Sequence, residues 1–81
     1  MQDEPTFTNP KTKNLWNKGQ ENGFGLYFLG DKAVLWANVD DQKRTWHWVR
    51  GMVVPANMDG LDGYSTANDA LIACETDLGL R

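Results

Sequence analysis

The chain has 81 residues, of which 41% are hydrophobic and 23% charged, and its formal net charge is −3. This length and composition indicate one small folded domain. It is near the size at which a single hydrophobic core needs to be stabilised further by a disulfide, a metal or a partner. The single cysteine excludes an internal disulfide, and one cysteine with one histidine cannot form a zinc cluster. We therefore expect no metal and no cofactor, and we expect any reinforcement to come from self-association or a partner protein.

The acidic balance argues against direct binding of nucleic acid, because such proteins collect Lys and Arg to neutralise phosphates. Residues 1–54 hold seven basic and six acidic residues, whereas residues 55–81 hold one basic and five acidic residues. The acidic residues of this last third are Asp59, Asp62, Asp69, Glu75 and Asp77. They form either a solvated face or a negative surface that guides the protein onto a basic target.

The sequence contains no pattern typical of a signal peptide or of a membrane-spanning segment. Its first residues lack the basic start and apolar core of a signal peptide, and no apolar run approaches the length of a membrane span. We expect a cytoplasmic protein that does not bind membranes.

Residues 1–14 are polar, contain two prolines and show no apolar period, so we interpret them as a flexible tail. Residues 15–81 are predicted to form a single folded domain. It begins with a lead-in segment, in which Trp16 covers one end of the core and Asn22–Gly23 marks a turn. The first strand is predicted within GFGLYFL, residues 23–29, because its side chains alternate between two faces.

Two further strands follow at short intervals. The Gly-Asp pair at 30–31 is typical of a tight hairpin, and residues 32–39 are rich in strand-forming side chains. After the polar turn DDQK, residues 44–54 predict a third strand, which Pro55 ends because proline has no amide to offer a neighbouring strand. Connections this short join antiparallel neighbours, so the three strands form a meander.

The end of the chain, from Ser65, predicts one helix. Ser65 or Thr66 can cap its first turn, and Gly79 suits a left-handed C-terminal cap. One stripe of small and apolar side chains has helical spacing: Ala67, Ala70, Leu71, Cys74 and Leu78. We expect this stripe to lie on one face of the sheet, with Cys74 buried as an inert thiol. The predicted fold is α+β: a three-stranded antiparallel sheet with one C-terminal helix and a flexible N-terminal tail.

At this point the chain resembles a group of small proteins encoded by bacteriophages and prophages, which combine a β-meander with a helix. The residues that carry the resemblance are Trp46-x-Trp48-Val49-x-Gly51, Gly63-Tyr64, and Thr66 ahead of Ala70, Ala73 and Glu75. The resemblance is one of layout over about residues 24–79, and it transfers no site residue. Members with known roles are often inhibitors or adaptors of host proteins, including components of bacterial defence. By analogy it implies a protein that binds a bacterial host protein.

The tryptophans raise the main functional question. Strand geometry puts Trp46, Trp48 and Arg50 on one face of the third strand, and Trp36 lies on one face of the second. One helix covers one side of a sheet, so the indoles either face the helix as core or form a surface on the open side. Such a surface would be covered by a second copy or by a target protein. Base stacking is a third interpretation, disfavoured by the scarcity of nearby cations.

No pattern of residues predicts a catalytic site, a calcium site or a phosphate-binding loop. His47 is interpreted as a cross-strand neighbour, because no motif holds a nucleophile or carboxylate against it. The segment NMDGLDG does not fit a calcium loop, since Leu61 and Asp62 stand where a ligand and a glycine are required. The glycines of GQENGFG lack the preceding strand and following lysine of a phosphate loop.

We therefore predict a non-enzymatic binding protein, a phage-type inhibitor or adaptor that occupies a surface of a bacterial host protein. The alternative is a structural homodimer with no host target. The predicted contact residues are Trp36, Trp46, Trp48, Arg50, Asp59 and Asp62.

Overall fold

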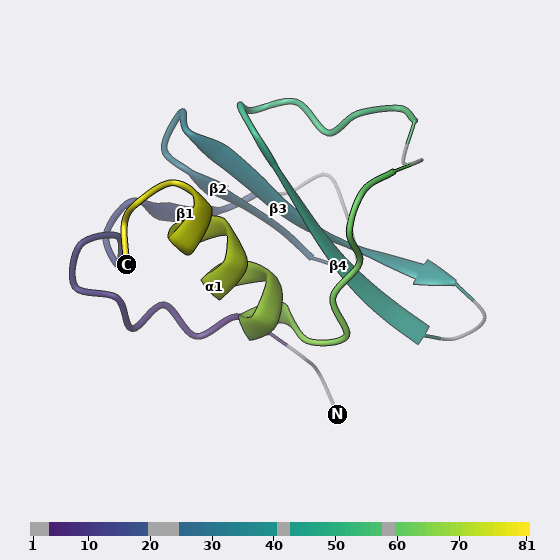
Figure 1. Cartoon of the computed structure of the whole chain (residues 1–81), viewed down its shortest axis with the longest axis horizontal. Coiled ribbons are helices and arrows are strands. Elements are labelled where there is room, and N and C mark those ends of the chain that lie inside the picture. Colours follow the sequence, from purple (N-terminus) through teal and green to yellow (C-terminus); the bar gives the residue numbers. More distant parts are fainter. Residues whose placement is uncertain (1–3, 20–24, 41–42, 58–59) are drawn as a thin grey trace.

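The computed structural model describes residues 4–19, 25–40, 43–57 and 60–81. Over these ranges the strands form one antiparallel sheet in which neighbours in the chain are neighbours in the sheet, and one helix lies across one of its faces (Figure 1). The predicted α+β class is confirmed, but the predicted count of three strands is wrong. The elements are β1 (Trp16–Lys18), β2 (Leu26–Leu29), β3 (Ala33–Asp40), β4 (Lys43–Arg50) and α1 (Ala67–Asp77).

The additional strand is β1, in the segment that we expected to be a lead-in. Trp16 stands opposite Leu29 of β2, and Lys18 stands opposite Tyr27. Three residues are too few to show an alternating pattern in the sequence. The strand forms because its one large side chain, Trp16, is buried beside its β2 neighbours, as the sequence suggested for this indole.

Strand β4 ends at Arg50, four residues earlier than predicted. Gly51 has a φ of 90°, in the left-handed region, and turns the chain out of the sheet. The partner strand also runs out here, because Arg50 pairs with Ala33 and the Gly51 amide donates to the Lys32 carbonyl oxygen at 2.8 Å. Residues 52–54 therefore have strand-forming side chains but, over the four described ranges, no strand to pair with. The predicted turn at Asn22–Gly23 and the centre of the DDQK turn lie outside the described residues.

The caps of α1 agree with the sequence. Thr66 is the N-cap, and its hydroxyl accepts the Asp69 amide at 3.1 Å. At the other end the Leu80 amide donates to the Glu75 carbonyl oxygen at 2.8 Å, with Gly79 in the left-handed conformation.

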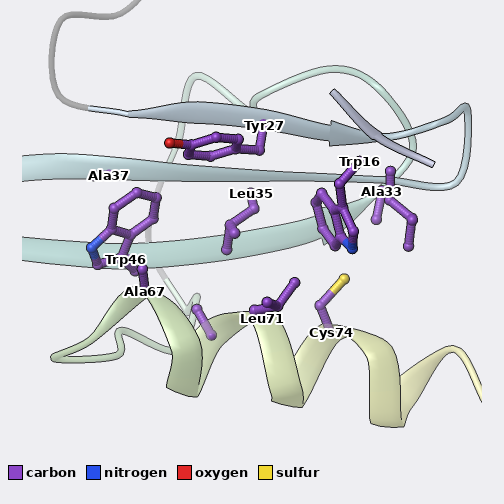
Figure 2. Packing of buried hydrophobic residues seen from close by; sticks show 11 residues of the cluster. Trp16, Tyr27, Ala33, Leu35, Ala37, Trp46, Ala67, Leu71 and Cys74 are labelled. Atoms are coloured by element: carbon purple, nitrogen blue, oxygen red, sulfur yellow. The ribbon is translucent and has the colours of Figure 1, made fainter. Parts of the chain in front are cut away.

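The sheet separates two groups of buried side chains. Figure 2 shows the group between sheet and helix, where Leu35 points toward Leu71, Trp46 lies at the Ala67 end of α1 and Trp16 at the Cys74 end. We call it the helix-facing cluster; it consists of Trp16, Tyr27, Leu29, Ala33, Leu35, Ala37, Trp46, Ala67, Ala70, Leu71 and Cys74. The outer cluster, on the opposite face, consists of Leu26, Val34 and Trp36, with Phe28, Val49 and Leu61 packed against it.

Residues 4–14, which we expected to be part of a flexible tail, lie along α1 instead, and we call them the N-terminal strap (Figure 1, purple). The Thr6 amide donates to Asn68 Oδ1 at 2.7 Å, and Asn9 Nδ2 donates to the Leu80 carbonyl oxygen at 2.9 Å. Phe7 stacks on Trp16. These contacts use single polar side chains and one ring, which leave no periodic signal in the sequence.

Candidate functional site

The three tryptophans that were predicted to be contact residues lie on different faces of the sheet. Trp46 is fully buried in the helix-facing cluster, and Trp48 is half-buried against the same cluster. Trp36 is buried in the outer cluster on the opposite face. The Nε1 atoms of Trp36 and Trp46 are buried and have no hydrogen-bond partner among the described residues. The predicted contact residues therefore do not form one surface.

Trp36 is covered by a loop although it lies on the helix-free face. His47 is a cross-strand neighbour, as predicted. It pairs with Trp36 across β3 and β4 and stacks on it with ring centroids 5.6 Å apart. His47 Nδ1 lies 3.0 Å from the Asp62 carbonyl oxygen, and because a carbonyl only accepts, Nδ1 is the donor. This bond holds the loop over the outer cluster, against which Leu61 packs.

The outer edge of β4 is only partly paired. Trp46 and Tyr64 exchange two backbone hydrogen bonds of 2.8 Å. In an antiparallel strand alternate residues point their N–H and C=O groups to the same side, so the backbone of Trp48 also points away from β3. Within the described ranges no backbone group pairs with Trp48 on that side. With respect to the residues that the structure describes, the edge is therefore open from Trp48 onward.

The open edge is bordered by an ion pair and by exposed apolar side chains. Arg50 Nη2 lies 2.9 Å from Asp77 Oδ2, and both side chains are exposed. Beyond Gly51, the exposed fractions of Met52, Val53 and Val54 are 53%, 79% and 39%. We call Trp48, Arg50 and residues 52–54 together the β4 edge surface. Trp48 and Arg50 were predicted to be contact residues, whereas residues 52–54 were predicted to be part of a strand.

The acidic residues of the last third do not form one negative surface. Asp62 and Asp69 are exposed, and Asp77 is paired with Arg50. Asp59, a predicted contact residue, lies outside the described residues. Glu75 is buried, with an exposed fraction of 1%.

Glu75 is a buried carboxylate bonded to several segments, a role that was not predicted from the sequence. Thr12 Oγ1 and Trp16 Nε1 both donate to its Oε2, the latter at 3.2 Å, and Arg81 Nε donates to its Oε1 at 2.7 Å. Burial would raise the pKa of Glu75, but the bonds from Thr12, Trp16 and Arg81 together hold it below its ordinary value. A signal was present, since Glu75 follows the buried Leu71 by one helical turn.

Cys74 lies next to Glu75 on the helix and is fully buried, as predicted. Burial, and then the negative charges of Glu75 and Asp77, raise the pKa of its thiol to about 12. In the part of the chain that the structure describes, no three His, Cys, Asp or Glu side chains are grouped so that they could hold a metal ion.

We found no match to this chain among protein-family models, curated proteins or solved structures. Within the described ranges, no helix has the length and the apolar character needed to cross a membrane. The β4 edge surface is the candidate functional site, because it joins unpaired backbone groups to exposed apolar side chains.

Proposed function

We propose that the protein is a non-enzymatic binding protein that occupies a surface of another protein through the β4 edge surface. The observation that carries this proposal is the exposure of three consecutive large apolar side chains, residues 52–54, directly after an edge strand. Large apolar side chains exposed to water are unfavourable, and where several lie close together they are typical of protein interaction sites.

The neighbouring groups suit binding of an extended segment. The unpaired backbone of Trp48 offers one donor and one acceptor to a strand laid beside β4. The half-buried indole of Trp48 and the guanidinium of Arg50 flank that edge, and tryptophan and arginine are frequent energetic anchors of interfaces. Of the predicted contact residues, Trp48, Arg50 and the exposed Asp62 stay in this proposal, while the buried Trp36 and Trp46 support the fold.

The resemblance in layout to small phage and prophage proteins adds the class of partner. In this proposal the protein is a phage-type inhibitor or adaptor, and its partner is a bacterial host protein. The exposed Asp62 and Asp69 then assist encounter with a basic region of the target.

A structural homodimer is the second candidate, and the open edge of β4 favours it. Two copies can pair their β4 edges and so cover the apolar residues that a single copy leaves exposed.

The test is capture of partners from a bacterial lysate by the tagged protein, beside the variants Val53→Asp and Ile72→Asp. Ile72 is a matched control, because it is an apolar side chain exposed to 45% but lies on α1. We expect one protein to be captured by the wild type and by Ile72→Asp, and to be lost with Val53→Asp. Equal capture by all three proteins would remove the β4 edge surface from the interface.

Light scattering over a range of dilutions separates the two candidates. A monomer at all concentrations would exclude the homodimer. A dimer that dissociates in Val53→Asp, with no partner captured, would replace the host-binding proposal.

A further inference from the structure

The N-terminal strap is joined to the fold by side chains and not by strand pairing. Its backbone-to-backbone bonds are local, such as the 2.8 Å bond from the Lys13 amide to the Asn9 carbonyl oxygen. Its bonds to other segments run from the Thr6 amide to Asn68, from the Asn9 side chain to Leu80 and from the Thr12 hydroxyl to Glu75. Isolated bonds of this kind open locally, without the cooperative loss of a ladder.

Glu75 is the point at which the strap is fastened most firmly. It receives Thr12 from the strap, Trp16 from β1 and Arg81 from the segment after α1. A buried carboxylate remains charged only while such donors surround it. When the charge is removed, one of its two terminal atoms becomes a donor and the other accepts more weakly, so the three donors can no longer all be satisfied. One side chain therefore connects the strap and β1, near the start of the chain, to α1 and the segment after it.

The rest of the fold has its own attachments. The buried stripe of α1 packs on Leu35 and Trp46 of the sheet, and β3 pairs with β4 over the full length of both strands. The strap adds Phe7, whose ring centroid lies 5.5 Å from that of Trp16 and 5.3 Å from that of Tyr27. Removing these contacts opens the flank of the helix-facing cluster beside β1 and leaves its centre in place.

We propose that the N-terminal strap is a detachable cover, held in place by the ionised carboxylate of Glu75. Detachment leaves α1 on the sheet and uncovers the aromatic flank formed by Trp16 and Tyr27. This inference is independent of the proposed function, because the strap lies beside β1 and the β4 edge surface lies at the opposite edge of the sheet (Figure 1).

Acid is one condition that detaches the strap. The groups set against Glu75 are the Arg81 guanidinium, the neutral donors of Thr12 and Trp16, and its helix neighbour Cys74. None of these four supplies a negative charge at neutral pH that could replace the carboxylate. The contribution of the carboxylate is present above its ordinary pKa of 4.5 and is lost as the pH falls through its lowered native pKa.

The test is hydrogen exchange followed by mass spectrometry on the full chain at neutral pH, for the wild type, Glu75→Gln and Asp77→Asn. Both variants remove one negative charge from α1, but among the described residues the Asp77 carboxylate is bonded to Arg50, and both of these side chains are exposed. In Glu75→Gln we expect amide exchange in residues 4–14 to be at least about tenfold faster. Residues 33–39, 44–49 and 67–74 should stay within about twofold of the wild type, and Asp77→Asn should match the wild type throughout.

Two results would overturn the proposal. Unchanged exchange of the strap in Glu75→Gln would mean that this carboxylate does not fasten it, and equal acceleration of strap, sheet and helix would mean that the strap is part of the core. If Glu75→Gln does not fold, Thr12→Val decides in the same way. This variant keeps the charge and removes only the donor that the strap supplies; faster exchange limited to residues 4–14 supports the detachable cover, and any other pattern rejects it.

Discussion

Replacing Trp46 by alanine tests whether this indole is core, as the structure has it, or contact surface, as we first expected. The side chain is fully buried and lies close to Tyr27, with ring centroids 6.2 Å apart. An indole buries about 200 Å², which at about 25 cal/mol per Å² corresponds to about 5 kcal/mol. Alanine keeps part of this, and Trp→Ala substitutions in cores cost about 3–5 kcal/mol. We expect Trp46→Ala to lower the free energy of unfolding by about 4 kcal/mol.

The loss is large for a chain of this length, whose stability should be about 4–12 kcal/mol. Urea unfolding followed by far-ultraviolet circular dichroism measures it, with Trp48→Ala as the comparison. Trp48 is half-buried, so its loss should cost about 1–2 kcal/mol and leave the protein folded. A cost below about 1 kcal/mol for Trp46, or equal costs for the two indoles, would refute the assignment of Trp46 to the core.

Three further predictions concern single sites. Gly25→Ala should destabilise the fold by about 1–3 kcal/mol in the same urea assay, because φ is 138° and the added Cβ would lie 2.6 Å from the ring of Trp46; an unchanged midpoint would contradict this. Cys74, with a pKa of about 12, should react with a thiol reagent at neutral pH only as fast as the fold opens, so labelling faster than global unfolding would count against burial of the thiol. Stability measured from pH 7 down to 3 should fall below about pH 4.5, and less steeply in Glu75→Gln, because the lowered pKa of Glu75 stabilises the fold only while the carboxylate is charged; parallel curves would disprove this.

Local periodicity was enough to predict the central part of the fold. Alternation placed Trp46 and Trp48 on one face of their strand and His47 on the other, and the observed pairing agrees. The i, i+3, i+4 stripe and the Thr66 cap likewise located α1 and its buried side. These features depend on neighbours within a few residues, and the sequence contains all of that information.

Strand β1, the strap and the bonds of Glu75 to Thr12 and Trp16 could not be predicted in this way. Each depends on a contact between distant segments, such as Thr12 with Glu75, which are 63 residues apart. One side chain carries such a contact, so no repeat in the sequence marks it.

The sequence by itself determined the class of fold, which side chains of the central strands share a face of the sheet, and where the helix begins and ends. These features follow from local steric and hydrogen-bond preferences. Only the tertiary structure decided which tryptophans are accessible. Trp36 is buried because a loop beyond β4 is held over it by the His47 bond to Asp62, and residues 52–54 are exposed because β3 begins too late to pair with them. Accessibility depends on what covers a residue, and the covering segments here come from elsewhere in the chain.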